Sequence, residues 1–185
     1  NPEPKRYDGL LLPFQVKDLA KIVPEVFRKG RGLKTITMAR ASLNNGQIIH
    51  AVNDLFIGPK SHGSARYTIK LGDRHERHSS SGVIVSTGLG STCWFTSLIT
   101  GANAVSEAFG SQTGGMKVLP AIPAPRFEWD AKHLFFTVRE PFPSKTSTAS
   151  LVFGRVTARQ PLQIASLMPE RGVIFSDGIE DDFLE

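Results

Sequence analysis

The chain has 185 residues, 40% of them hydrophobic, which is enough for one domain with a buried core. No apolar stretch approaches the ~18 residues of a membrane-spanning helix, no secretory signal opens the chain, and the single cysteine excludes an internal disulfide. We therefore expect a cytoplasmic protein without a membrane partner. The net charge of +5 suits an anionic partner, but aromatic residues are not interleaved with clustered basic ones, so nucleic acid is not the expected partner.

The first part of the chain predicts a helix between short extended segments. A short strand is expected at residues 10–12 and a helix over 17–29. Residues 33–41 alternate between apolar and polar side chains, and Asn44-Asn45-Gly46 has the composition of a hairpin turn. We therefore predict a strand over 33–41 that pairs with a return strand over 47–57.

The rest of the chain predicts a second hairpin, a buried strand, a helix and several short strands. The hairpin covers 65–80 with Gly72-Asp73 at its turn, the strand is the β-branched run Val83-Ile84-Val85, and the helix covers 94–109. A loop is expected at 110–115, followed by strands at 116–121, 133–138, 150–156, 161–165 and 173–175. Many short strands with few helices predict a mainly β, sandwich-like fold of the α+β class.

Residues 86–92 connect the buried strand to the helix through glycines and hydroxyl side chains. Glycine has no Cβ and lets a ligand approach the backbone, and a helix N-terminus favours polar or negatively charged oxygen atoms. We interpret this junction as a nucleotide site; the alternative is a tight connection without a ligand. No lysine precedes Ser91-Thr92, which excludes a P-loop, and Gly88-Leu89-Gly90 lacks the third glycine of the dinucleotide fingerprint.

Three other groups of polar residues are candidates for chemistry. His75 and His78 are three apart on a predicted strand and point to opposite faces, so they cannot share one metal ion and no metal ligand is expected. Cys93 is expected to be a buried structural thiol, because no partner motif for a nucleophile accompanies it. Asn53-Asp54 at a strand end could bracket a ribose diol and an adenine edge, or could serve only as turn residues.

Taken in order, these segments resemble the carboxy-terminal β-rich domain of the NAD kinases. That family has an Asn-Glu or Asn-Asp pair, a hairpin, a Gly-Asp-Gly element, an apolar strand and the sequence Thr-Pro-Thr-Gly-Ser-Thr-Ala-Tyr. This chain has, in the same order, Asn53-Asp54, the hairpin 65–80, Ser80-Ser81-Gly82, Val83-Ile84-Val85 and residues 86–94, Ser-Thr-Gly-Leu-Gly-Ser-Thr-Cys-Trp. The first ten residues resemble the segment that joins the two domains of the family, and Ser176-Asp177-Gly178 is similar to its late Asp-Gly turn.

The resemblance implies phosphoryl transfer from ATP to the 2′-hydroxyl of the adenosine ribose of NAD, with a divalent metal such as Mg²⁺ on the phosphates. It implies that Asp54 holds ribose hydroxyls, that Asn53 bonds the dinucleotide and that Trp94 lies against a base. Thr92, the backbone of Cys93 and Ser97 would surround an adenine. The resemblance assigns four further residues to the nucleotide site, namely Ser81, Thr87, Gly90 and Ser91.

Three departures from the family pattern change what the resemblance implies. Ser81 stands where the family has the Asp of Gly-Asp-Gly, Trp94 stands where it has tyrosine, and the Gly-Gly-Asp-Gly motif with the expected catalytic base is not found in residues 1–185. We therefore expect one NAD(H)-binding domain over 1–185, with 1–12 as the crossover from a preceding α/β domain, that supports catalysis within a longer, homo-oligomeric enzyme. The alternatives are a non-catalytic nucleotide-binding or regulatory module, and a kinase of an altered acceptor such as a lipid or sphingoid base.

Overall fold

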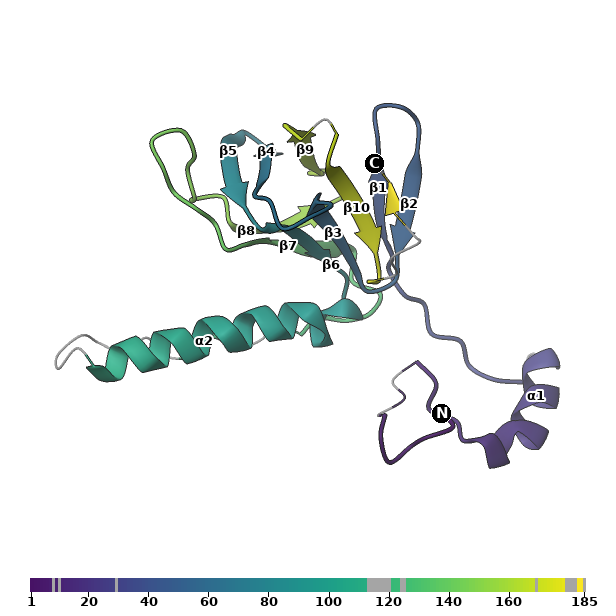
Figure 1. Cartoon of the computed structure of the whole chain (residues 1–185). Coiled ribbons are helices and arrows are strands. Elements are labelled where there is room, and N and C mark those ends of the chain that lie inside the picture. The colour runs from purple at the N-terminus through teal and green to yellow at the C-terminus, as the bar shows by residue number, and fades with distance from the viewer. Residues whose placement is uncertain are drawn as a thin grey trace. The chain divides into compact units, whose positions relative to one another are not determined.

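The computed structural model describes the chain apart from residues 8, 10, 29, 113–120, 124–125, 169, 179–182 and 185. The chain divides into two compact units, Asn1–Thr35 and Ile36–Glu185 (Figure 1). Over the residues described, no helix is both long enough and apolar enough to cross a membrane. The assignment of residues 1–185 to one domain, with 1–12 as a crossover, remains a prediction.

The first unit contains the predicted helix. A turn of 3-10 helix, η1 (Val16–Asp18), leads into α1 (Leu19–Phe27), which confirms the helix expected over 17–29. Pro24 lies inside α1 and has no N–H to donate, and the helix ends three residues later. The Arg28 amide closes the end by donating to the Pro24 carbonyl at 3.1 Å.

The strand predicted at 10–12 is wrong where the structure describes it. Leu11 lies in a bend, and the Leu12 amide donates to the Gly9 carbonyl at 2.9 Å. Gly9 has a φ of +66°, a conformation that glycine adopts without strain. The chain therefore turns back here and does not extend; Leu10 itself lies outside the described residues.

The second unit is built from antiparallel strands and one long helix (Figure 1). The helix α2 (Trp94–Gln112) follows β6 through a 3-10 turn, η2 (Gly90–Thr92). In the described part of the chain the sheets are β1-β2, β11-β10-β3-β6-β7-β8 and β5-β4-β9, in these orders. The strands are β1 (Ala39–Ser42), β2 (Ile48–Ala51), β3 (Asp54–Pro59), β4 (Ala65–Leu71), β5 (Arg74–Ser80), β6 (Gly82–Ser86), β7 (His133–Arg139), β8 (Phe153–Thr157), β9 (Leu162–Ser166), β10 (Gly172–Ser176) and β11 (Phe183–Leu184).

Both predicted hairpins are confirmed. Gly46, with a φ of +87°, makes the turn between β1 and β2, and Gly72, with a φ of +59°, makes the turn between β4 and β5. The strands predicted at 83–85, 133–138, 161–165 and 173–175 and the helix predicted at 94–109 are also confirmed, as β6, β7, β9, β10 and α2.

The single return strand predicted over 47–57 is wrong, because the chain breaks it at Val52 and Asn53 into β2 and β3, which belong to different sheets. The carboxylate of Asp177 accepts the backbone N–H groups of Val52, Asn53 and Asp54 at 2.9, 2.6 and 3.2 Å. These amides therefore bond to a side chain and not to a neighbouring strand. The strand predicted over 33–41 is also shorter than expected, because its partner β2 ends at Ala51. Its pairing therefore starts only at Ala39, which lies opposite Ala51.

The remaining boundary predictions are mixed. The strand predicted over 150–156 starts only at Phe153, and the predicted loop at 110–115 is wrong for residues 110–112, which continue α2. Residues 113–115 lie outside the described residues, as do 116–120 of the strand predicted at 116–121; Ala121 is not in a strand.

The hydrophobic core lies against one face of the six-stranded sheet. Leu55, Val83, Val85 and Phe136 come from this sheet, and they pack in one buried cluster with residues of β4, among them Tyr67 and Ile69, and with Ala39, Ile49 and Ala51 of the first hairpin. Packing of sheets around a common core confirms the sandwich-like α+β fold. Alternation along the strands leaves the opposite face of the six-stranded sheet for other contacts.

Candidate functional site

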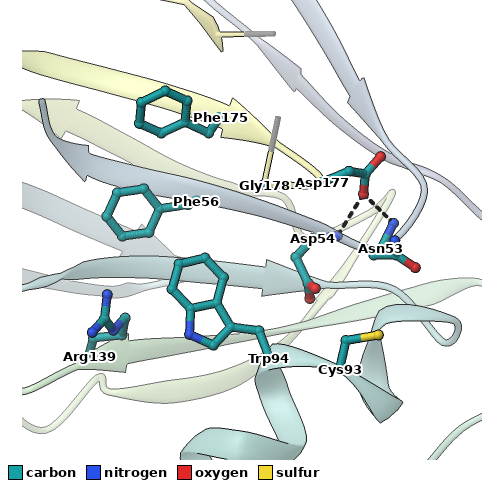
Figure 2. A pocket seen from close by; sticks show the side chains of 9 residues that line it. All are labelled: Asn53, Asp54, Phe56, Cys93, Trp94, Arg139, Phe175, Asp177 and Gly178. Carbon is teal, nitrogen blue, oxygen red and sulfur yellow. Dashed lines mark hydrogen bonds between the residues drawn. The ribbon is translucent and has the colours of Figure 1, made fainter. Parts of the chain in front are cut away.

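The opposite face of the six-stranded sheet carries a cavity of about 570 Å³ (Figure 2). In β3, Asp54 and Phe56 alternate with the core residue Leu55, so both point to this face, and Phe175 lies directly opposite Phe56 on β10. The cavity is bounded by the ends of β3, β7 and β10 and by the start of α2. Its lining residues are Asn53, Asp54, Phe56, Cys93, Trp94, Arg139, Phe175, Asp177 and Gly178.

Asp177 fixes the polar end of the cavity. Besides accepting the three N–H groups of residues 52–54, it donates its own backbone N–H to the Asp54 carbonyl at 2.9 Å. From the other side, Thr87 donates its N–H to the Asn53 carbonyl at 2.9 Å and its hydroxyl to the Val52 carbonyl at 2.6 Å. The Asn53-Asp54 pair is therefore held between the β10 turn and the loop after β6, while the Asn53 side chain forms no hydrogen bond within the described part of the chain.

Burial changes the acid chemistry of Asp54. Its side chain lies almost entirely out of solvent, with the residue 7% exposed. Desolvation raises the pKa of Asp54 from 3.8 to about 6; a hydrogen bond from Ser86 opposes this rise, and the nearby charge of Asp177 adds to it. The Oδ1 atom of Asp54 is buried and has no hydrogen-bond partner among the residues that the structure describes. The carboxylate of Asp54 therefore combines a hydrogen-bond acceptor on the cavity wall with one oxygen that is left unsatisfied in the fold.

Aromatic rings form the apolar part of the cavity. Phe56 stacks between Trp94 and Phe175, with ring centroids 5.6 and 6.3 Å away. Two glycines allow Phe56 to lie flat on the sheet, because a Cβ on Gly58 or Gly82 would come within 2.4 or 2.5 Å of its ring. The indole of Trp94 thus presents a broad π-face at the start of α2, of the kind that stacks on a planar heterocycle.

The glycines of the predicted loop serve a different purpose from the one expected. A Cβ on Gly90 would lie 2.2 Å from the Asn53 carbonyl oxygen, and one on Gly88 would lie 2.1 Å from the carbonyl oxygen of Glu128. The close approach that these glycines permit is therefore to the backbone of the chain itself. Gly90 acts on the cavity by letting η2 pack against the Asn53-Asp54 pair.

The predicted site residues fall into three groups. Asn53, Asp54, Cys93 and Trp94 line the cavity described above. A second cavity of about 280 Å³ lies beyond the loop, where Ser91 and Thr92 meet Arg126, Phe127 and Trp129. Their hydroxyls are occupied locally, since Ser91 donates to the Gly88 carbonyl and Thr92 to that of Leu89. The other predicted residues, Ser81, Thr87, Gly90 and Ser97, line neither cavity.

Two expectations about reactive side chains have different outcomes. Cys93 is exposed and lines the first cavity, so the expectation of a buried structural thiol is wrong. It sits at the C-cap of the short η2 turn, where the chain leaves the core before α2 begins. On β5, His78 is buried whereas His75 is exposed, so the two rings do lie on opposite faces of the strand.

Sequence reasoning missed Phe56, Arg139, Phe175 and Asp177 as members of the site. Phe56 follows Asp54 by two residues and shares its face, so strand alternation alone could have found it. Arg139 and Phe175 come from β7 and β10, and they join the site only through the strand order. Asp177 belongs to the Asp-Gly turn noted in the sequence, but nothing in the sequence shows that it bonds residues 52–54.

Comparisons with known proteins find similarity in solved structures. The chain superposes on the crystal structure of yeast NADH kinase complexed with NADH with a TM-score of 0.55 and 20% sequence identity, over 94% of this chain and 45% of that one. It superposes on an NAD kinase from Archaeoglobus fulgidus in complex with ATP with a TM-score of 0.52 and 12% identity, over 91% of this chain and 54% of that one. The fold is NAD kinase-like.

The NAD kinase-like fold is established from structure alone. No family model matches the sequence, and no curated protein matches it either. The chain spans about half the length of the two kinases on which it superposes. In this fold the cavity between β3, β10 and the start of α2 contains the residue pair and the aromatic residue that the sequence resemblance assigns to the dinucleotide.

Proposed function

We propose that this chain is the NAD(H)-binding part of an NAD kinase-like enzyme, and that its first cavity holds the adenosine half of the dinucleotide. In the whole enzyme the reaction would be ATP-dependent phosphorylation of the ribose 2′-hydroxyl to give NADP. The NAD kinase-like fold supports this proposal. The single observation that carries it is the convergence of Asn53, Asp54 and Trp94 on one cavity.

Each of these residues would make one type of contact. The carboxylate of Asp54 would accept a hydrogen bond from a ribose hydroxyl, and the Asn53 amide would supply both a donor and an acceptor. The indole of Trp94 would stack on a planar base. These residues would bind and orient the ribose, which is the main contribution a protein makes to phosphoryl transfer.

The residues of the cavity do not fit a metal site. Within the described part of the chain, no group of three or more His, Cys, Asp or Glu side chains is placed to hold an ion. Asp177, the second carboxylate of the cavity, already accepts three backbone N–H groups. We therefore assign no ligand for Mg²⁺ and no catalytic base to this chain, and we propose only that it positions the acceptor.

Isothermal titration calorimetry of the chain with NAD, NADH, NADP and ATP tests the proposal. We expect a dinucleotide to bind, and Asn53→Ala to weaken it by about tenfold, the effect of losing side-chain hydrogen bonds to a ligand. Asn44→Ala is the matched control, because Asn44 is an exposed residue of the β1-β2 hairpin turn outside the cavity. The proposal fails if no dinucleotide binds, or if the two variants bind equally well.

A further inference from the structure

Arg139 lines the cavity from the last position of β7, where its guanidinium lies between an exposed carboxylate and an aromatic ring. Its charged neighbour is Glu140, with 3.6 Å between Arg139 Nε and Glu140 Oε2, and the Glu140 side chain is 60% exposed. That distance is longer than a hydrogen bond, and Arg139 Nε has no hydrogen-bond partner among the described residues. Among those residues, the buried side-chain polar atoms without a partner are Arg139 Nε, Asp54 Oδ1 and His78 Nδ1. Two of these three atoms belong to residues that line the same cavity.

The two unsatisfied groups lie at opposite ends of the cavity. Asp54 pairs with Ser86 and Arg139 pairs with Gly82, at the two ends of β6 and on its two sides. With strands about 4.8 Å apart and a rise of about 3.3 Å per residue, their Cα atoms are about 16 Å apart. Figure 2 shows the Trp94 indole between the two side chains. The separation prevents an ion pair between them and leaves room for a ligand that reaches both.

Trp94 holds the guanidinium in a position to meet an anion. The Arg139 Cζ atom lies over the indole, 5.3 Å from the ring centroid, in a cation–π contact. A guanidinium that contacts a ring in this way can still donate the N–H groups of its edge, and their planar fork matches phosphate. At the other end, the carboxylates of Asp54 and Asp177 repel an anion. The cavity therefore has a preferred direction for a ligand with hydroxyls at one end and negative charge at the other.

We infer, on the basis of the proposed function, that Arg139 binds the pyrophosphate of the dinucleotide whose ribose lies at Asn53 and Asp54. In this arrangement the pyrophosphate oxygens accept hydrogen bonds from the N–H groups at the edge of the Arg139 guanidinium, and a ribose hydroxyl lies beside the Asp54 carboxylate. In the adenosine half the ribose joins the base to the pyrophosphate, so the ribose and its 5′-phosphates span the distance between these two contacts. Arg139 is a ligand-binding residue here and takes no part in the chemical step.

The test compares a ligand that has phosphates with one that does not. NAD and adenosine are titrated into the chain and into Arg139→Met, with adenosine measured by displacement of NAD. Loss of a charge-assisted contact should weaken NAD by about tenfold to hundredfold and leave adenosine within about twofold. Arg139→Lys keeps the positive charge but not the planar fork of N–H groups, and its NAD affinity should lie between that of the unchanged chain and that of Arg139→Met. The matched control is Arg155→Met, an exposed arginine of β8 outside the cavity, which should bind both ligands as the unchanged chain does.

The outcomes separate the inference from the proposed function. If the unchanged chain binds NAD and Arg139→Met binds it equally well, the inference is wrong and the proposed function stands. The same holds if Arg139→Met loses NAD and adenosine to the same extent, because Arg139 then supports the shape of the cavity and does not contact phosphate. If the unchanged chain binds neither ligand, both are wrong. Circular dichroism and thermal unfolding of each variant check that the fold is retained.

Discussion

Replacement of Asp54 by asparagine should stabilise the folded chain at neutral pH while it weakens ligand binding. Burial raises the pKa of Asp54 from 3.8 to about 6, so that ionisation is less favourable in the folded chain than in the unfolded one. A carboxyl group whose pKa is raised by folding adds to the free energy of unfolding at low pH. This stabilisation is fully present below the pKa of the unfolded chain and is lost as the pH rises through the pKa of the folded chain. The difference between the two pKa values corresponds to about 3 kcal/mol, which is the upper limit of the gain for the uncharged variant.

Urea unfolding between pH 4 and 8 measures this effect. At pH 4 the two proteins should have similar free energies of unfolding. The difference should grow between pH 4 and 7 in favour of Asp54→Asn, and then remain constant. Asp73→Asn, an exposed residue of the β4-β5 turn, is the control and should give no comparable trend.

Two results would refute the reasoning. One is a difference between Asp54→Asn and the unchanged chain that is independent of pH, because it would mean that ionisation of Asp54 costs nothing in the fold. The other is a variant that is less stable at every pH. If the variant is instead more stable and binds NAD poorly, the buried carboxylate is retained for the ligand at a cost in stability.

Three further substitutions test how the cavity is built. Gly90→Ala should lower the free energy of unfolding by about 2 to 3 kcal/mol and weaken NAD binding, because its Cβ would meet the Asn53 carbonyl. The control in urea unfolding is Gly101→Ala, because a Cβ at Gly101 would meet no other atom within 4 Å. Asp177→Ala should lower the free energy of unfolding by at least about 3 kcal/mol, since three backbone N–H groups lose a charged acceptor. A decrease below about 1 kcal/mol would show that water replaces the carboxylate. Gly58→Ala should push the Phe56 ring into the cavity, lower the free energy of unfolding by about 1 to 3 kcal/mol and reduce the affinity for NAD. An unchanged NAD affinity in calorimetry would show that the ring moves elsewhere and leaves the cavity open.

Local sequence signals were sufficient for the parts of the fold that form between neighbours. Asn44-Asn45-Gly46 and Gly72-Asp73 predicted the two hairpins, because glycine at a positive φ closes such turns. The β-branched run at 83–85 predicted a strand that is buried on both faces. These elements depend on residues a few positions apart, and their prediction needed no knowledge of the sheet order.

The parts that failed depend on contacts between distant residues. The break between β2 and β3 is made by Asp177, which lies 125 positions after Val52. No alternation pattern near residue 52 reveals it, so the local sequence predicts 47–57 as one strand. The site shows the same division: Asn53, Asp54 and Trp94 were found from the motif order, whereas Arg139 and Phe175 reach the cavity only because β7 and β10 flank the β3-β6 pair.

Cys93 gives the cavity a chemical handle of its own. It is the single cysteine of the chain, it is exposed, and it lies on the cavity wall. A maleimide dye or a nitroxide spin label would therefore attach at one known point without any engineered thiol. Protection of this thiol from alkylation would report occupancy of the cavity directly, for any candidate molecule and without an assay of turnover.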